Sequence, residues 1–131
     1  MQATTHAPSI SSSRLWTGRV LGGLPTLFLL FDGIIKLLQL APVKAAHERL
    51  GYPAHLAVGI GILELICTVL YLVPRTTVLG AVLLTGYLGG ATATLVRVGD
   101  PFFFPLIVGA LIWAGLLLRD ERLRGLVSPR G

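Results

Sequence analysis

The chain has 131 residues, a mean hydropathy of +0.79 and only 13% charged residues, compared with roughly 25% in ordinary soluble domains. A soluble domain this short could not bury so much apolar surface, so the composition indicates a membrane protein. The formal net charge of +5 does not indicate nucleic-acid binding, because the arginines lie at the ends of apolar segments instead of along one basic stripe. A single cysteine, Cys67, excludes a disulfide framework and an internal dithiol relay.

The N-terminal part of the chain predicts a tail, a first membrane span and a short surface helix. Residues 1–13 are polar and lack periodicity, which predicts a disordered cytoplasmic tail. Arg14 and Arg19 flank Trp16 at the start of an apolar segment, and a first span is predicted at about 17–40. The amphipathic stretch from Pro42 to Tyr52 predicts a short helix lying in the headgroup region between spans 1 and 2.

Three more apolar segments follow, and they predict spans at about 55–73, 77–97 and 102–118, with a charged cytoplasmic tail at 120–131. Four spans place both termini on one side of the membrane. Most of the arginines fall on that side, which predicts that both termini are cytoplasmic. The expected fold is therefore all-α: one transmembrane domain over residues 14–119, built as a four-helix up-down bundle with a short interfacial helix.

The third predicted span carries a stripe of small residues. Gly86 and Gly90 form a G-x-x-x-G spacing, and Thr94 continues it by one more turn. Small residues allow the backbones of membrane helices to approach closely, so these three residues are predicted to pack against another helix.

Charged residues inside the predicted spans are the candidate functional residues. Counted by depth, Asp32, Lys36, Glu64 and Arg97 all fall in the outer half of the bundle, and Tyr87 lies beneath them. Each charge alone would cost about 2.5–3.5 kcal/mol near the bilayer centre, so the four should face inward and pair. Two interpretations stay open: an ion-pair lock that fixes helix register, or a polar pocket that binds a ligand.

Motifs for catalysis and for metal binding are not found. No predicted span contains a histidine, which argues against axial haem ligation within the bundle, and no G-x-S-x-G, P-loop or H-E-x-x-H motif is present. No catalytic residue and no metal site is predicted, and the chain is not expected to be an enzyme by itself.

Three blocks of sequence carry a family resemblance: LFLLFDGIIKLL, LGYPAHLAVGIGILELICTVLYLVPRT and TGYLGGATATLVRVGDPFFFP. In this order they resemble the DoxX-like family of small bacterial four-helix membrane proteins, over about residues 16–120. The resemblance implies a multi-pass protein of the bacterial inner membrane. It also implies that these polar positions are characteristic of the family: Asp32, Lys36, Glu64, Tyr87, Arg97 and Asp100.

The leading hypothesis is an accessory inner-membrane protein that uses Asp32, Lys36, Glu64, Tyr87 and Arg97 to bind a small lipophilic or anionic molecule. The resemblance suggests quinone as that molecule, while the chain itself carries no cofactor ligands. The first alternative is the membrane subunit of a quinone-linked oxidoreductase whose redox centre lies on a partner protein. The second is a structural or assembly role, in which the glycine stripe forms a homodimer or contacts another membrane protein. The lipid bilayer is the partner common to all three.

Overall fold

The computed structural model describes residues 12–53 and 55–127, which form helices joined by short connections and include no strand. The predicted all-α class is therefore confirmed. Of the predicted N-terminal tail, residues 1–11 lie outside the described residues, and Ser12 and Ser13 already belong to the first helix. The elements in chain order are α1 (Ser12–Leu38), α2 (Ala41–Arg49), α3 (Leu56–Leu72), the 3-10 turn η1 (Pro74–Thr76), α4 (Thr77–Val98), α5 (Phe103–Arg119) and α6 (Glu121–Val127).

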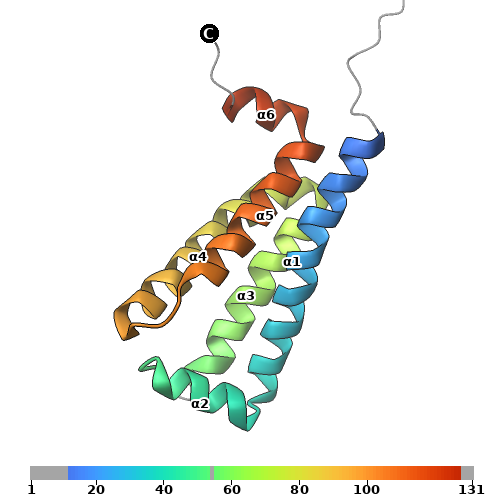
Figure 1. Cartoon of the computed structure of the whole chain (residues 1–131). Helices are drawn as coiled ribbons and strands as arrows, with labels where there is room; N and C mark the ends of the chain where they lie inside the picture. Colours follow the sequence, from blue (N-terminus) through green and yellow to red (C-terminus); the bar gives the residue numbers. More distant parts are fainter. Residues whose placement is uncertain (1–11, 54, 128–131) are drawn as a thin grey trace, which may run out of the picture.

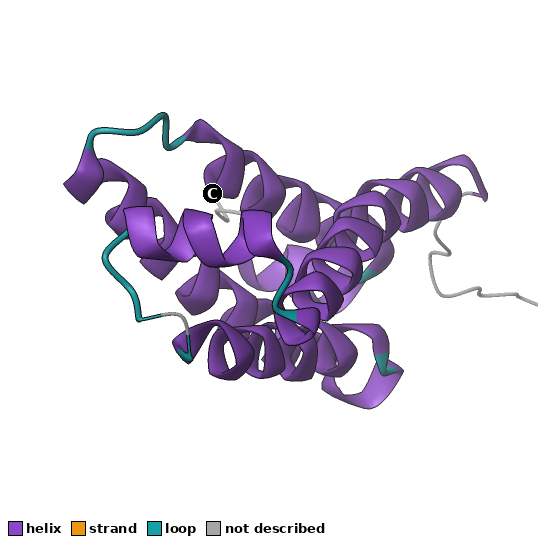
Figure 2. Ribbon diagram, turned by 90° about the horizontal axis from the view of Figure 1, so that it is seen from below, coloured by secondary structure: helices purple, strands orange, loops and turns teal. Residues whose placement is uncertain are grey.

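The long helices α1, α3, α4 and α5 run alternately in opposite directions and pack as a ring, α1 against α3, α3 against α4, α4 against α5 and α5 against α1. Figure 1 shows α2 at one end of this bundle, while α6, η1 and the start of α1 lie at the other end. Seen from below, α2 lies across the front of the bundle (Figure 2). The short helix expected between Pro42 and Tyr52 thus corresponds to α2.

Glycines set the closest approaches between the helices. A methyl group added at Gly115 of α5 would lie 2.5 Å from the Gly22 nitrogen of α1, and one at Gly61 of α3 would lie 2.9 Å from the Gly33 oxygen of α1. At Gly80 of α4 an added methyl group would meet the backbone of α3 in the same way. These approaches are closer than any residue larger than glycine allows, so they fix the spacing of three helix pairs.

The predicted packing role of the glycine stripe on α4 is wrong within this chain. Atoms added at Gly86 or Gly90 would meet nothing within 4 Å, and both residues are exposed. The buried residues of α4 are Gly80, Ala81, Leu84 and Leu88, which share a face of the helix that Gly86 and Gly90 do not belong to. The stripe therefore lies on a face of α4 that no other helix among the described residues covers, which the spacing of glycines in the sequence does not reveal.

The outer surface of the bundle is apolar. Leu24, Leu27 and Phe31 on α1 are each more than 60% exposed, and long aliphatic side chains are exposed on α3, α4 and α5 as well. The buried interior contains smaller and polar side chains beside its aliphatic core, among them Thr26, Thr68 and Glu64. Large apolar side chains facing outward around a partly polar interior are typical of a protein whose surroundings are lipid.

Within the described residues, two helical segments are long and apolar enough to cross a membrane: Ser12–Leu38 and Pro74–Val98. A third candidate arises if α5 and α6 count as one span, although they are bent by 115°. The helix α3 is apolar and shorter, with 17 residues.

The bend between α5 and α6 has a local cause. The Asp120 carboxylate accepts a hydrogen bond from the Leu123 backbone nitrogen (3.0 Å), which caps the start of α6, and the Arg124 guanidinium donates to the Leu117 carbonyl near the end of α5 (2.7 Å). Most of the predicted charged tail is thus a capped helix, and residues 128–131 lie outside the described residues.

Candidate functional site

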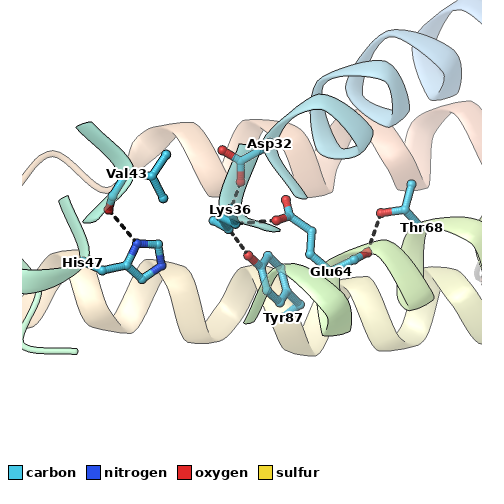
Figure 3. A network of polar contacts seen from close by, with 7 residues as sticks. All are labelled: Asp32, Lys36, Val43, His47, Glu64, Thr68 and Tyr87. Atoms are coloured by element: carbon cyan, nitrogen blue, oxygen red, sulfur yellow. Dashed lines mark hydrogen bonds and ion pairs between the residues drawn. The ribbon is translucent and has the colours of Figure 1, made fainter. Parts of the chain in front are cut away.

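A lysine joins three helices near the α2 end of the bundle. The Lys36 ammonium of α1 lies 2.6 Å from Asp32 Oδ2, 2.9 Å from Glu64 Oε1 of α3 and 2.8 Å from the Tyr87 hydroxyl of α4. Figure 3 shows Lys36 between these three side chains. An ammonium group has three hydrogens, so this arrangement uses all of its donor capacity. We call these four residues the Lys36 cluster.

The members of the cluster differ in exposure. The side chain of Glu64 is 0% exposed, that of Lys36 is 13% exposed and that of Asp32 is 26% exposed. Glu64 Oε1 accepts from Lys36, whereas Glu64 Oε2 has no hydrogen-bond partner. Among the described residues it is the one buried side-chain nitrogen or oxygen in that condition. An unpaired buried carboxylate oxygen is costly, so it requires an explanation.

Helix geometry and a glycine contact assemble the cluster. Asp32 and Lys36 are four residues apart, so they lie on one face of α1, and Lys36 is in the last turn, where a cation is favoured by the helix dipole. Gly33 and Gly61 lie in contact one turn before Lys36 and Glu64 along their helices. Because this contact brings α1 and α3 unusually close, the lysine can reach the buried carboxylate.

Arg97 does not join the cluster, contrary to the sequence-based prediction. Its guanidinium donates a hydrogen bond to the Leu50 carbonyl, at the end of α2. The last carbonyls of a helix have no partner within the helix and attract cations, which explains this position. Nearby, Asp100 forms an ion pair of 2.6 Å with Arg49, whose side chain is 61% exposed.

Two cavities adjoin the cluster. The larger, about 460 Å³, lies between α2, α3 and α4, and its walls are mainly apolar, with Lys36 and Tyr87 among the lining residues. The smaller, about 140 Å³, is lined by residues of α1, α3, α4 and α5 and includes both carboxylates. Lys36 and Tyr87 line both cavities, whereas Asp32 and Glu64 line the smaller one alone. The hydrogen bond between Lys36 and Tyr87 therefore lies where the two cavities meet.

Comparison with known proteins gives one result that decides the family. A model of the DoxX-like family matches residues 20–115, which is most of the chain and includes the whole Lys36 cluster. The chain belongs to the DoxX-like family. Together with the apolar helices, this membership identifies it as a membrane protein. No curated protein and no solved structure gives a significant match to the chain.

In this DoxX-like protein the glycine stripe lines the larger cavity. Gly86, Gly90 and Thr94 all belong to its wall, and the Thr94 hydroxyl lies 3.0 Å from the hydroxyl of Tyr52. The absence of side chains at the two glycines leaves the space that a neighbouring helix was predicted to fill. The same residues therefore form part of the wall of the larger cavity, which their spacing in the sequence did not indicate.

The sequence analysis missed His47. This histidine of the predicted short helix was not among the candidate site residues, but it is 7% exposed and lines the larger cavity. Its Nδ1 lies 3.0 Å from the Val43 carbonyl (Figure 3). A carbonyl can only accept, so Nδ1 carries the hydrogen and Nε2 is left as an acceptor in the neutral ring. The sequence feature that could have indicated His47 is the polar face of α2. A helix that crosses the end of a bundle turns part of its surface inward, so a polar residue on it can line a cavity.

Proposed function

We propose that the protein crosses the bacterial inner membrane four times, through α1, α3, α4 and α5, with α2 in the outer headgroup region. The 17 residues of α3 and of α5 reach the lower limit of about 17 for a span. The end of the bundle that carries α6, η1 and the start of α1 (Figure 1) holds most of the arginines, which supports cytoplasmic termini. These arginines are Arg14, Arg19, Arg75, Arg119, Arg122 and Arg124.

Within this topology, the protein binds a small lipophilic molecule in the larger cavity. The observation that carries this proposal is the position of the Lys36–Tyr87 hydrogen bond on the wall of a mainly apolar cavity. Such a cavity, apolar with a few convergent polar groups, is the usual form of a small-molecule site. Its volume suits a small molecule, and the two glycines in its wall, Gly86 and Gly90, are exposed on the surface of α4.

The chemistry of the polar end favours a neutral ligand over an anionic one. Lys36 has no hydrogen left for an incoming anion, since Asp32, Glu64 and Tyr87 take all three. The Tyr87 hydroxyl accepts from Lys36 and therefore keeps its own hydrogen to donate. A carbonyl oxygen on the ligand is the group that this hydrogen suits, and a quinone is a lipophilic molecule that carries one.

Binding of a short-chain benzoquinone to the purified protein in detergent, measured by calorimetric titration, tests the proposal. Gly86→Leu places a side chain in the larger cavity and should abolish binding, whereas Gly89→Leu is the matched control. Both positions have nothing within 4 Å, and only Gly86 lines the cavity. Tyr87→Phe should weaken binding about tenfold, the effect of losing roughly 1.4 kcal/mol. Unchanged affinity in Gly86→Leu would refute the site.

A contact with another membrane helix is the second candidate, because Gly86 and Gly90 are exposed on the surface of α4. A small-residue stripe permits the close approach of a second copy or of a partner subunit, including the redox partner of a quinone-linked oxidoreductase. The same Gly86→Leu variant distinguishes the two. A changed elution volume with unchanged quinone affinity supports the helix contact, and the opposite result supports the cavity.

A further inference from the structure

We propose that the smaller cavity is a binding site for a protonated amine, recognised by Glu64, Asp32 and the aromatic rings beside them. This site is separate from the larger cavity, and the two proposals can fail independently. The argument rests on the charge of the Lys36 cluster, on the unpartnered oxygen of Glu64 and on the side chains that complete the cavity wall.

The Lys36 cluster contains one more acidic group than basic groups. It holds two carboxyl groups and one ammonium, and the ion pairs of the described residues bring no cation other than Lys36 to either carboxyl. Arg97 could have balanced the charge, but it is bound to the Leu50 carbonyl instead. With both carboxyls ionised the cluster has a net negative charge, which is expensive within the membrane-spanning part of a protein unless a proton or a positive group approaches it. The cluster therefore favours a ligand that brings a positive charge.

The unpartnered oxygen gives that ligand a specific point of attachment. Glu64 is 0% exposed, its Oε2 has no partner, and the residue lines the smaller cavity and not the larger one. In Figure 3 the second carboxylate oxygen of Glu64 points away from Lys36. Because the three hydrogens of Lys36 are already used, the hydrogen at Oε2 comes either from a proton on Glu64 itself or from another donor. A protonated amine supplies both the hydrogen and the charge.

The rest of the cavity wall suits the carbon substituents of an amine. Phe28 of α1 and Phe104 of α5 both line it, and their rings pack edge to face with centroids 4.9 Å apart. The faces of aromatic rings attract ammonium groups, and their edges contact apolar substituents. Both rings are partly exposed, 40% for Phe28 and 54% for Phe104, so they form the side of the cavity that faces the bilayer. A volume of about 140 Å³ holds an amine of only a few heavy atoms.

Calorimetric titration of the purified full chain with butylamine hydrochloride, in phosphate buffer free of other amines, tests this site. The neutral comparison ligand is 1-butanol, which has the same chain without the charge. We expect the wild type to bind the amine at least tenfold more tightly than the alcohol. Glu64→Gln should remove this preference, whereas Glu121→Gln should preserve it, because Glu121 lies on α6 and pairs with Arg124 there.

A second variant keeps the test decisive if Glu64→Gln does not fold. Phe104→Leu changes an exposed ring in the cavity wall, and it should weaken the amine more than the alcohol, because only the amine brings a positive charge to the ring. Gly86→Leu should abolish quinone binding in the larger cavity and leave the amine affinity unchanged, which separates the two sites. Equal affinities for amine and alcohol in the wild type would overturn the proposal. So would an infrared band of a protonated Glu64 carboxyl that persists at saturating amine, because a proton would then occupy the position of the ligand.

Discussion

Replacing Lys36 with methionine tests how strongly the polar cluster depends on its one cation. The substitution keeps most of the side-chain volume but removes three hydrogen bonds, to Asp32, Glu64 and Tyr87. Glu64, with a side chain 0% exposed, would then have neither oxygen paired. Breaking a buried ion pair by removing one partner costs about 3–5 kcal/mol. The unfolding equilibrium constant should therefore rise by roughly two to four orders of magnitude.

The unfolding free energy can be measured by titrating detergent micelles with sodium dodecyl sulfate and following tryptophan fluorescence. Lys44→Met is the matched control, since Lys44 is exposed on α2 and its loss should change stability by less than about 0.5 kcal/mol. Adding Glu64→Gln to Lys36→Met removes the unpaired charge, so the double variant should be more stable than Lys36→Met, with a coupling of about 1–3 kcal/mol. A Lys36→Met protein as stable as the wild type, or a double variant less stable than Lys36→Met, would refute the reasoning.

Three further predictions concern other parts of the bundle. Gly80→Ala should destabilise the protein by more than 1 kcal/mol, since the added methyl group meets the α3 backbone at Tyr71. Gly86→Ala is the control and should be neutral, because its methyl group meets nothing within 4 Å. Denaturation of the two variants side by side measures the difference. Tyr71→Phe should lower the unfolding free energy by about 1–2 kcal/mol, because the buried Tyr71 hydroxyl bonds to two groups on α5. Asp100→Asn should lower it by less than about 1 kcal/mol, since Asp100 pairs with an exposed arginine, and the difference should shrink at high salt.

Sequence patterns were sufficient for the all-α class and for most of the polar cluster. Composition and helix-length apolar runs predicted membrane helices, because lipid permits few other structures. Depth counted along the spans placed Asp32, Lys36 and Glu64 at one level, and the structure brings them together with Tyr87. This worked because each residue of a helix rises by a fixed 1.5 Å, so depth can be read from position in the chain. Whether the cluster binds a ligand stays a prediction.

The predictions that failed concern Arg97 and the glycine stripe, and both depend on how α4 is placed relative to the other helices. Arg97 has the depth of the cluster, yet it lies on a part of α4 that has separated from α3, and a carbonyl at the end of α2 is its partner. Gly86 and Gly90 have the spacing of a packing motif, but they lie on a different face of α4 from its buried residues Gly80, Leu84 and Leu88. The packing glycines, among them Gly80 and Gly115, lack so regular a pattern. The packing of all the helices together determines which small residues form the close contacts between helices.

The two ends of the bundle differ in a way that bears on the choice between a lock and a binding site. At the end near α6, the Tyr71 hydroxyl donates to the Ile112 carbonyl (2.9 Å) and accepts from Arg119 (2.7 Å). That hydroxyl is therefore used both as donor and as acceptor, as expected of a polar group whose role is to hold helices together. This end ties α3 to α5 without help from the Lys36 cluster.

At the other end, the Lys36 cluster joins helices just as firmly but leaves one buried oxygen, Glu64 Oε2, without a partner. Two cavities adjoin it, of about 460 Å³ and 140 Å³. A purely structural lock gains nothing from an unpaired oxygen or from missing packing, since both lower stability. A ligand that fills the space and supplies a hydrogen would remove both penalties at once. The contrast within one bundle is therefore the physical reason to look for ligands at the Lys36 end.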